Sequence, residues 1–188
     1  MATKSLLFNQ EPVWHENRQG TRHKLPVAVQ SWAYESGSLT QRLRNVYGGS
    51  VAVSVLLQKW HSPFLSEQKL LKQPDSRYSL IREVLLHTEG RPLILARTII
   101  PAETIKIAHS NLSQLGTRPL GEVIFSYPKL ERVEMDVTLI KPCLWASITL
   151  DKVAIDQPIW GRRTVYGIRH RYMLVSEFFL PEVLRWGE

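Results

Sequence analysis

Two apolar segments joined by a short turn constrain the fold of this chain more than any other part of it. Residues 78–87 and 93–100 are rich in leucine, isoleucine and valine, a composition typical of β-strands. The connection between them contains Glu89-Gly90, and a two-residue turn with glycine in the second position joins antiparallel strands. We therefore predict a β-hairpin whose second strand ends at Pro101.

A second hairpin is predicted near the C-terminus. Residues 164–168 and 172–180 have the composition of strands and flank a basic connection at residues 169–171. Residues 51–60 are β-branched and apolar, and residues 131–140 alternate between polar and apolar side chains, so both are further strand candidates. Four or more strands connected in this way predict an antiparallel sheet.

The predicted helices fall into two blocks. In the first block, residues 25–34 precede a second helix, for which Ser38 is the expected N-cap and Gly48-Gly49 the end. In the second block, residues 102–115 and 120–125 follow the first hairpin. Helices grouped apart from hairpin-connected strands predict an α+β fold, with a single antiparallel β-sheet and helices packed on it.

The chain is long enough for one domain with its own core, because it has 188 residues. Residues 1–24 are polar and show no periodicity. We predict a mobile or loosely docked N-terminal arm there, which Trp14 anchors to the rest of the chain. Residues 25–188 are then expected to form the single domain.

Composition excludes several classes of protein. The only cysteine, Cys143, rules out an internal disulfide or a cysteine zinc cluster, and no two of the six histidines have metal-ligand spacing. No apolar run has the length of a signal peptide or membrane span, so we expect a cytoplasmic protein without stable membrane insertion. The net charge of +7 suits either polyanions or small anionic substrates and does not choose between them.

A regular hairpin with a two-residue turn would place Arg82 directly opposite Arg97 on an apolar face of the sheet. Two facing guanidinium groups are unfavourable there without an anion, and their fork-shaped donors suit a carboxylate. This pattern favours a carboxylate-binding site on the inner face of the sheet. The alternative is that the two arginines pair with Glu83 or Glu177 or reach solvent, and the residues alone leave both interpretations open.

Glu177 is the second anomaly, because its predicted strand is apolar on both faces. A carboxylate in such a place needs a partner or takes up a proton. It is therefore a candidate general acid or base, or an acceptor for a substrate hydroxyl. The alternative is a structural salt bridge to an arginine.

A basic cluster follows in the last third of the chain, at Arg162, Arg163, Arg169, His170 and Arg171. One interpretation is a patch that binds nucleic acid. We favour a solvated hairpin tip, and an RNA-binding module ranks last because the chain lacks an exposed motif of aromatic and basic residues. No nucleic-acid partner is therefore expected.

Several segments resemble the chorismate pyruvate-lyase family. In chain order they are residues 76–83 (SRYSLIRE), 96–101 (ARTIIP), 115–121 (LGTRPLG), 160–163 (WGRR) and 176–181 (SEFFLP). A fainter match, residues 38–43 (SLTQRL), lies in the first helical block. The resemblance runs from about residue 30 to residue 181, and its specificity comes from the order and spacing of the segments.

The resemblance implies a lyase, without a cofactor or metal, that converts chorismate to 4-hydroxybenzoate and pyruvate for quinone biosynthesis. It also implies a single antiparallel sheet with helical flaps covering an enclosed ligand site, in a chain that we expect to be a monomer. Arg82 matches the arginine that holds the ring carboxylate, and Glu177 matches the buried glutamate that meets the ring hydroxyl. Leu39 and Leu120 match flap positions that contact the ligand, and Arg97 matches a further active-site arginine.

The chain departs from the family pattern in two places. Residue 39 is often methionine in the family, a change that is tolerated if the backbone makes the contact. Between Gly121 and Trp160 the chain is longer than the bacterial form, and the additional residues, around 137–156, either extend the sheet or form an added loop.

A second function is carried alongside the lyase: a sensor domain that binds a small aromatic acid without reacting it. Ligand-sensing domains of some bacterial transcription regulators have a similar architecture, and fold does not dictate chemistry. Such a regulator needs a DNA-binding helix-turn-helix domain, and the roughly 25–30 residues before the sheet are too few for one.

Overall fold

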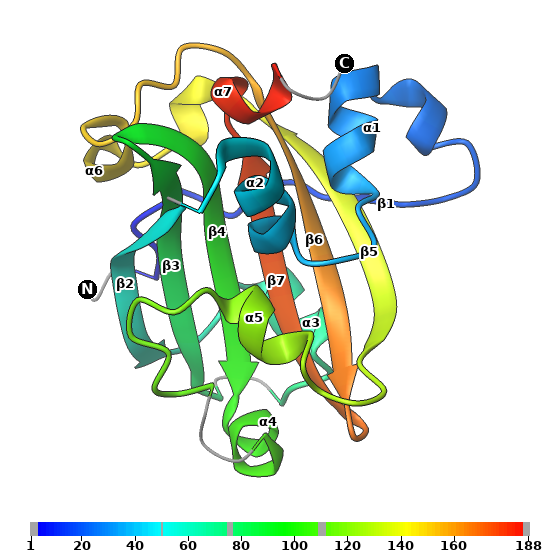
Figure 1. Cartoon of the computed structure of the whole chain (residues 1–188). Helices are drawn as coiled ribbons and strands as arrows, with labels where there is room; N and C mark the ends of the chain where they lie inside the picture. Colours follow the sequence, from blue (N-terminus) through cyan, green and yellow to red (C-terminus); the bar gives the residue numbers. More distant parts are fainter. Residues whose placement is uncertain (1–3, 50, 75–76, 109–111, 186–188) are drawn as a thin grey trace.

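The computed structural model describes residues 4–49, 51–74, 77–108 and 112–185 (Figure 1). Its centre is a seven-stranded sheet in the order β1-β5-β6-β7-β4-β3-β2, in which every neighbouring pair is antiparallel. The predicted α+β class is therefore confirmed. The strands are β1 (His15–Glu16), β2 (Ala52–His61), β3 (Ser79–Thr88), β4 (Arg91–Pro101), β5 (Glu131–Ile140), β6 (Ile159–Ile168) and β7 (Arg171–Phe179).

Three of the described helices cover the front face of the sheet in the view of Figure 1, and the other helical elements lie at its ends and behind it. The front helices are α1 (Val27–Ala33), α2 (Leu39–Tyr47) and α5 (Leu120–Ile124). The remaining elements are α3 (Leu65–Leu70), α4 (Ala102–Ile107), α6 (Ser147–Leu150) and α7 (Pro181–Leu184), with 3-10 turns η1 (Arg22–Lys24) and η2 (Pro142–Leu144). The helix predicted over residues 102–115 is shorter than expected: α4 ends at Ile107, and residues 109–111 lie outside the described chain.

Both predicted hairpins are present, and their turns use left-handed backbone. Glu89 and Gly90 have φ values of 48° and 77°, and Arg169 and His170 have φ values of 47° and 67°. Two consecutive left-handed residues match the right-handed twist of the flanking strands. The second hairpin has longer arms than predicted, because β6 begins at Ile159.

The register of the first hairpin corrects the expected pairing of Arg82 with Arg97. A bulge shifts the register between Leu86 and His87, so that Arg82 lies opposite Thr98. The shift falls beside Pro92, which cannot donate a ladder hydrogen bond. A one-residue shift moves side chains to the other face of a strand, so the two arginines lie on opposite faces of the sheet.

Arg97 instead joins a buried ion-pair network on the back face. Its Nε and Nη2 donate to Glu67 at 2.7 and 2.9 Å, and its Nη1 donates to Glu83 at 2.7 Å. The side chain of Arg97 is only 1% exposed. The attraction of the two carboxylates outweighs burial, so the pKa of Arg97 lies above its ordinary value. The network ties α3 to β3 and β4.

The N-terminal segment is bound to the same network, which corrects the expectation of a loosely docked arm. Ser5 Oγ and the backbone N–H of Leu6 donate to Glu83. Leu7 and Phe8 are buried in the core, and Trp14 packs against Phe178 with ring centroids 6.0 Å apart. Residues 5–8 are therefore part of the packed structure.

The additional residues between β5 and β6 cover the back of the sheet. β5 continues to Ile140, and η2 and α6 follow it. Trp145, Val153 and Ile155 are buried there and share a core cluster with Phe178 of β7. The insertion thus completes a strand and adds a loop behind the sheet, away from the front helices.

Replacing Arg97 with glutamine is expected to lower the free energy of unfolding by about 3–5 kcal/mol, because Glu67 and Glu83 would remain buried without their cation. Denaturant titration of the full chain measures this. The control is Arg18→Gln, which breaks an exposed ion pair with Glu16 that is worth about 1 kcal/mol or less. Equal losses in the two variants would contradict the prediction.

Candidate active site

A pocket lies between the front helices and the centre of the sheet. Its floor comes from β2, β3, β4, β6 and β7, and its cover comes from the start of α2 and from α5 with its two flanking residues. Four of the five predicted site residues line it: Leu39, Arg82, Leu120 and Glu177. Arg97 is the exception, because the register shift places it behind the sheet.

Arg82 brings an unneutralised positive charge to this pocket. The residue is only 2% exposed. Its Nη1 donates to Gln58 Oε1 at 2.7 Å, and its Nη2 donates to the backbone oxygen of Arg118 at 3.4 Å. No carboxylate among the described residues forms an ion pair with it.

Burial without a counter-charge lowers the pKa of Arg82. An anion in the pocket would relieve this penalty, because a buried charge is costly until it is paired. The sequence left two alternatives open for Arg82, a carboxylate partner or contact with solvent. Among the described residues, the structure shows neither. Within the part of the chain that the structure describes, Arg82 is therefore a buried cation without a counter-ion.

Glu177 lies across the floor from Arg82, on β7. Its Oε2 accepts a hydrogen bond from Arg162 Nε at 2.7 Å, so the alternative of a structural salt bridge to an arginine is confirmed. Glu177 nevertheless lines the pocket, and its side chain is 14% exposed against 1% for Arg162. The pair is therefore asymmetric: the arginine side chain is fully buried, and the carboxylate is partly exposed to the pocket.

The cover of the pocket is formed where two short helices meet. Ser38 caps α2 by accepting a hydrogen bond from the backbone N–H of Gln41. Gly121 approaches this cap so closely that a Cβ there would lie 2.5 Å from Ser38 Oγ. An ion pair between Arg44 and Glu122 also joins α2 to α5. Figure 1 shows the two helices side by side above the central strands.

The basic cluster at residues 162–171 divides in two. Arg169, His170 and Arg171 are exposed at the turn, as predicted. Arg162 and Arg163 are buried in β6, which corrects their assignment to a solvated tip. The two side chains lie on opposite faces of the sheet because strand residues alternate: Arg162 meets Glu177 in front, and Arg163 behind pairs with Asp136.

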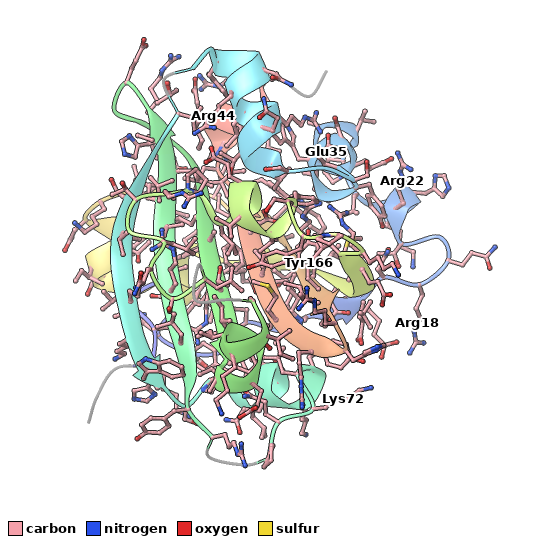
Figure 2. The ribbon with its side chains drawn as sticks, turned by 60° about the horizontal axis from the view of Figure 1, so that its bottom comes forward. Arg18, Arg22, Glu35, Arg44, Lys72 and Tyr166 are labelled. Carbon is pink, nitrogen blue, oxygen red and sulfur yellow. The ribbon has the colours of Figure 1, made fainter. Side chains whose placement is uncertain are left out.

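Sequence reasoning missed three residues at the site: Gln58, Arg162 and Tyr166. Tyr166 lines the pocket and is buried, and Figure 2 shows it in the middle of the molecule. Burial raises the pKa of Tyr166, and the nearby carboxylate of Glu177 raises it further. The alternation of β6 is the signal that could have found Arg162 and Tyr166, because both share a face with the pocket.

Two negative findings apply to the described part of the chain. Among residues 4–49, 51–74, 77–108 and 112–185, no three His, Cys, Asp or Glu side chains are grouped so that they could hold a metal ion. None of the helices in these ranges has the length and apolar character needed to span a bilayer.

Comparison with known proteins gives one family. A family model described as "Chorismate lyase" matches residues 9–186. A protein of Methylococcus capsulatus named "Probable chorismate pyruvate-lyase" is 41% identical over 156 residues, which cover 83% of this chain and 96% of the relative. A protein of Methylobacillus flagellatus with the same name is 31% identical, and the match covers 92% of this chain and 94% of the relative.

Solved structures share the fold at low identity. The effector domain of PhnF from Mycobacterium smegmatis superposes with a TM-score of 0.55 at 14% identity, over 77% of this chain and 90% of that domain. A GntR-family transcriptional regulator from Bacillus cereus gives a TM-score of 0.54 at 14% identity, over 71% of this chain and 94% of that structure. At such identities the likeness extends to the fold alone.

Proposed function

The chain belongs to the chorismate lyase family, and from this premise we propose that it converts chorismate to 4-hydroxybenzoate and pyruvate. The observation that carries the proposal is the pair of Arg82 and Glu177 in one pocket. Arg82 is a buried cation without a counter-ion among the described residues, and Glu177 is a carboxylate open to the same space. A ring with a carboxylate at one end and a hydroxyl at the other complements this pair.

In the proposed site, Arg82 binds the ring carboxylate through its guanidinium donors. Glu177 accepts a hydrogen bond from the ring hydroxyl with the oxygen that Arg162 leaves free. Leu39 and Leu120 contact the ligand from the cover, where α2 and α5 begin. Arg97 has no role in this proposal because it lies on the other face of the sheet.

The proposed reaction is an elimination. The ether bond between the ring and the enolpyruvyl group breaks, the ring carbon that bears the hydroxyl loses its hydrogen, and the leaving group takes up a proton to become pyruvate. Aromatisation supplies much of the driving force, so the protein contributes mainly by positioning and by excluding water. Arg82 and Glu177 fix the ring at its two ends, and the cover closes over it.

The remaining assignments are proposals of the same kind. We propose that the reaction needs no cofactor, that the protein acts as a monomer in the cytoplasm, and that its product feeds quinone biosynthesis. We also propose the enclosure of the ligand beneath the α2 and α5 flaps, and a single domain of residues 25–188 onto which residues 5–8 pack.

The test is incubation of the purified full chain with chorismate, without added metal or nucleotide. Equal amounts of 4-hydroxybenzoate and pyruvate, well above the spontaneous rate, are expected. Tight binding of 4-hydroxybenzoate without turnover would favour a sensor that uses the same pocket. If the chain showed no turnover and no binding of 4-hydroxybenzoate, both functions would be contradicted.

Gly121→Ala is expected to weaken 4-hydroxybenzoate binding about five-fold. The new methyl group would displace Ser38 Oγ from its capping position, and loss of a helix N-cap costs about 1 kcal/mol. Titration calorimetry on the full chain measures the dissociation constant. Gly49→Ala is the matched control, because a Cβ at Gly49 meets nothing within 4 Å. Equal affinities of the two variants would contradict a closed cover.

A further inference from the structure

Arg162 connects Glu177 to the segment from which the α2 cover begins. Besides the hydrogen bond to Glu177, its Nη1 donates to the backbone oxygens of Ala33 at 2.9 Å and Glu35 at 3.0 Å. Ala33 is the last residue of α1, and Glu35 lies in the connection to α2. A cation is favoured at a helix C-terminus, where carbonyl groups lack partners within the helix. One guanidinium thus contacts both the floor and the support of the cover.

Glu177 is the main counter-charge of Arg162. Burial lowers the pKa of the guanidinium, but Glu177, with smaller contributions from Tyr166 and Glu35, outweighs it, so the pKa of Arg162 lies above its ordinary value. The two residues are direct cross-strand partners in β6 and β7. Their separation is therefore fixed by the sheet and does not depend on a flexible loop.

Arg162 is the ion-pair partner of Glu177 among the described residues. The residues of α2 and α5 that line the pocket are uncharged. The other charged and titratable groups at this end of the pocket are Arg82 and Tyr166 in its lining, Glu35, which acts on Arg162, and Arg132 over the Tyr166 ring. Figure 2 shows Glu35 beside the front helices and Tyr166 deeper in the molecule. Of the cations, only Arg162 forms an ion pair with Glu177 among the described residues.

We propose that Arg162 is a positioning residue for the lyase reaction: it holds the Glu177 carboxylate oriented toward the pocket, and it ties this orientation to the segment that supports the α2 cover. The inference rests on the proposed function, because it assumes that Glu177 meets the substrate. Arg162 itself stays behind the carboxylate and does not line the pocket.

The chain contains a matched control in the next residue. Arg163 is also buried, its Nε also donates to a carboxylate at 2.7 Å, in Asp136, and its Nη1 donates to Ser66 Oγ. It differs in facing the back of the sheet, where its guanidinium packs over the Trp14 ring. Loss of a buried ion pair destabilises the fold at either position. Only at Arg162 is the partner carboxylate one that lines the pocket.

The experiment compares Arg162→Gln and Arg162→Lys with Arg163→Gln and Arg163→Lys in the full chain, by thermal unfolding and by kcat and KM for chorismate. Without the guanidinium, the Glu177 carboxylate loses the group that orients it, so kcat of Arg162→Gln should fall at least ten-fold. KM should change by less than five-fold, because Arg82 still binds the ring carboxylate. Arg162→Lys should restore only part of kcat, because one ammonium group cannot reproduce the fork of donors. Both Arg163 variants should unfold at lower temperature and keep the wild-type kcat and KM.

The outcomes separate the inference from the function. A wild-type chain without turnover would contradict the proposed function. Wild-type turnover with equal kcat values in Arg162→Gln and Arg163→Gln would overturn the role of Arg162 and leave the function standing. If Arg162→Gln does not fold, the comparison of Arg162→Lys with Arg163→Lys tests the inference. The kcat of Arg162→Lys should then be at least five-fold lower than that of Arg163→Lys, and equal kcat values would overturn the inference.

Discussion

Arg82→Ala is expected to abolish detectable binding of 4-hydroxybenzoate, raising the dissociation constant at least 100-fold. The guanidinium is buried and has no carboxylate partner among the described residues, so the carboxylate of the ligand would be its only counter-charge. Removing one member of a buried charge pair costs about 2–5 kcal/mol. Titration calorimetry with the full chain measures the loss.

A neutral ligand provides the control for this prediction. 4-Hydroxybenzamide has the shape of 4-hydroxybenzoate without its charge, and it should bind the wild-type chain and Arg82→Ala with affinities within a few fold. Thermal unfolding checks the fold, which should be kept because the alanine removes an unpaired buried cation. Unchanged affinity of Arg82→Ala for 4-hydroxybenzoate would contradict the site.

The sheet could be predicted from the sequence because its strands carry their own signals. The two hairpins have apolar arms and turns with left-handed backbone, and β5 has alternating side chains over its predicted range. Local composition is enough for such elements. Local composition does not reveal the position of a β-bulge. The bulge beside Pro92 determines the face of the sheet on which Arg97 lies.

The parts of the site that sequence reasoning missed depend on contacts between distant segments. Arg162 looked like part of a basic tip because its charged neighbours at residues 169–171 are close in sequence. Its partners are the backbone of residues 33–35 and a carboxylate on the next strand. Similarly, the N-terminal segment looked loose because nothing in its composition shows that Glu83, far along the chain, accepts its hydrogen bonds. Partners of buried charges are a tertiary property, and local patterns do not encode them.

Glu177→Gln is expected to reduce kcat about 100-fold, the lower range of what a positioned acid or base contributes, while the dissociation constant of 4-hydroxybenzoate changes by less than five-fold. The amide keeps the shape of the side chain and can still accept the Arg162 hydrogen bond. It cannot carry the negative charge that orients the ring hydroxyl or assists the proton. Affinity is kept because it depends on the carboxylate at Arg82, at the other end of the ligand.

The matched control is Asp136→Asn, which removes the carboxylate paired with Arg163 on the back of the sheet. Both variants leave a buried arginine beside a neutral amide, so their losses of unfolding free energy should be similar, about 1–3 kcal/mol. Only Glu177→Gln should lose turnover. If the two variants lost the same share of kcat, the loss would reflect a weakened sheet, and Glu177 would have no part in the chemistry. If neither lost turnover while Arg82→Ala still lost binding, the reaction would need only the carboxylate anchor and the closed pocket.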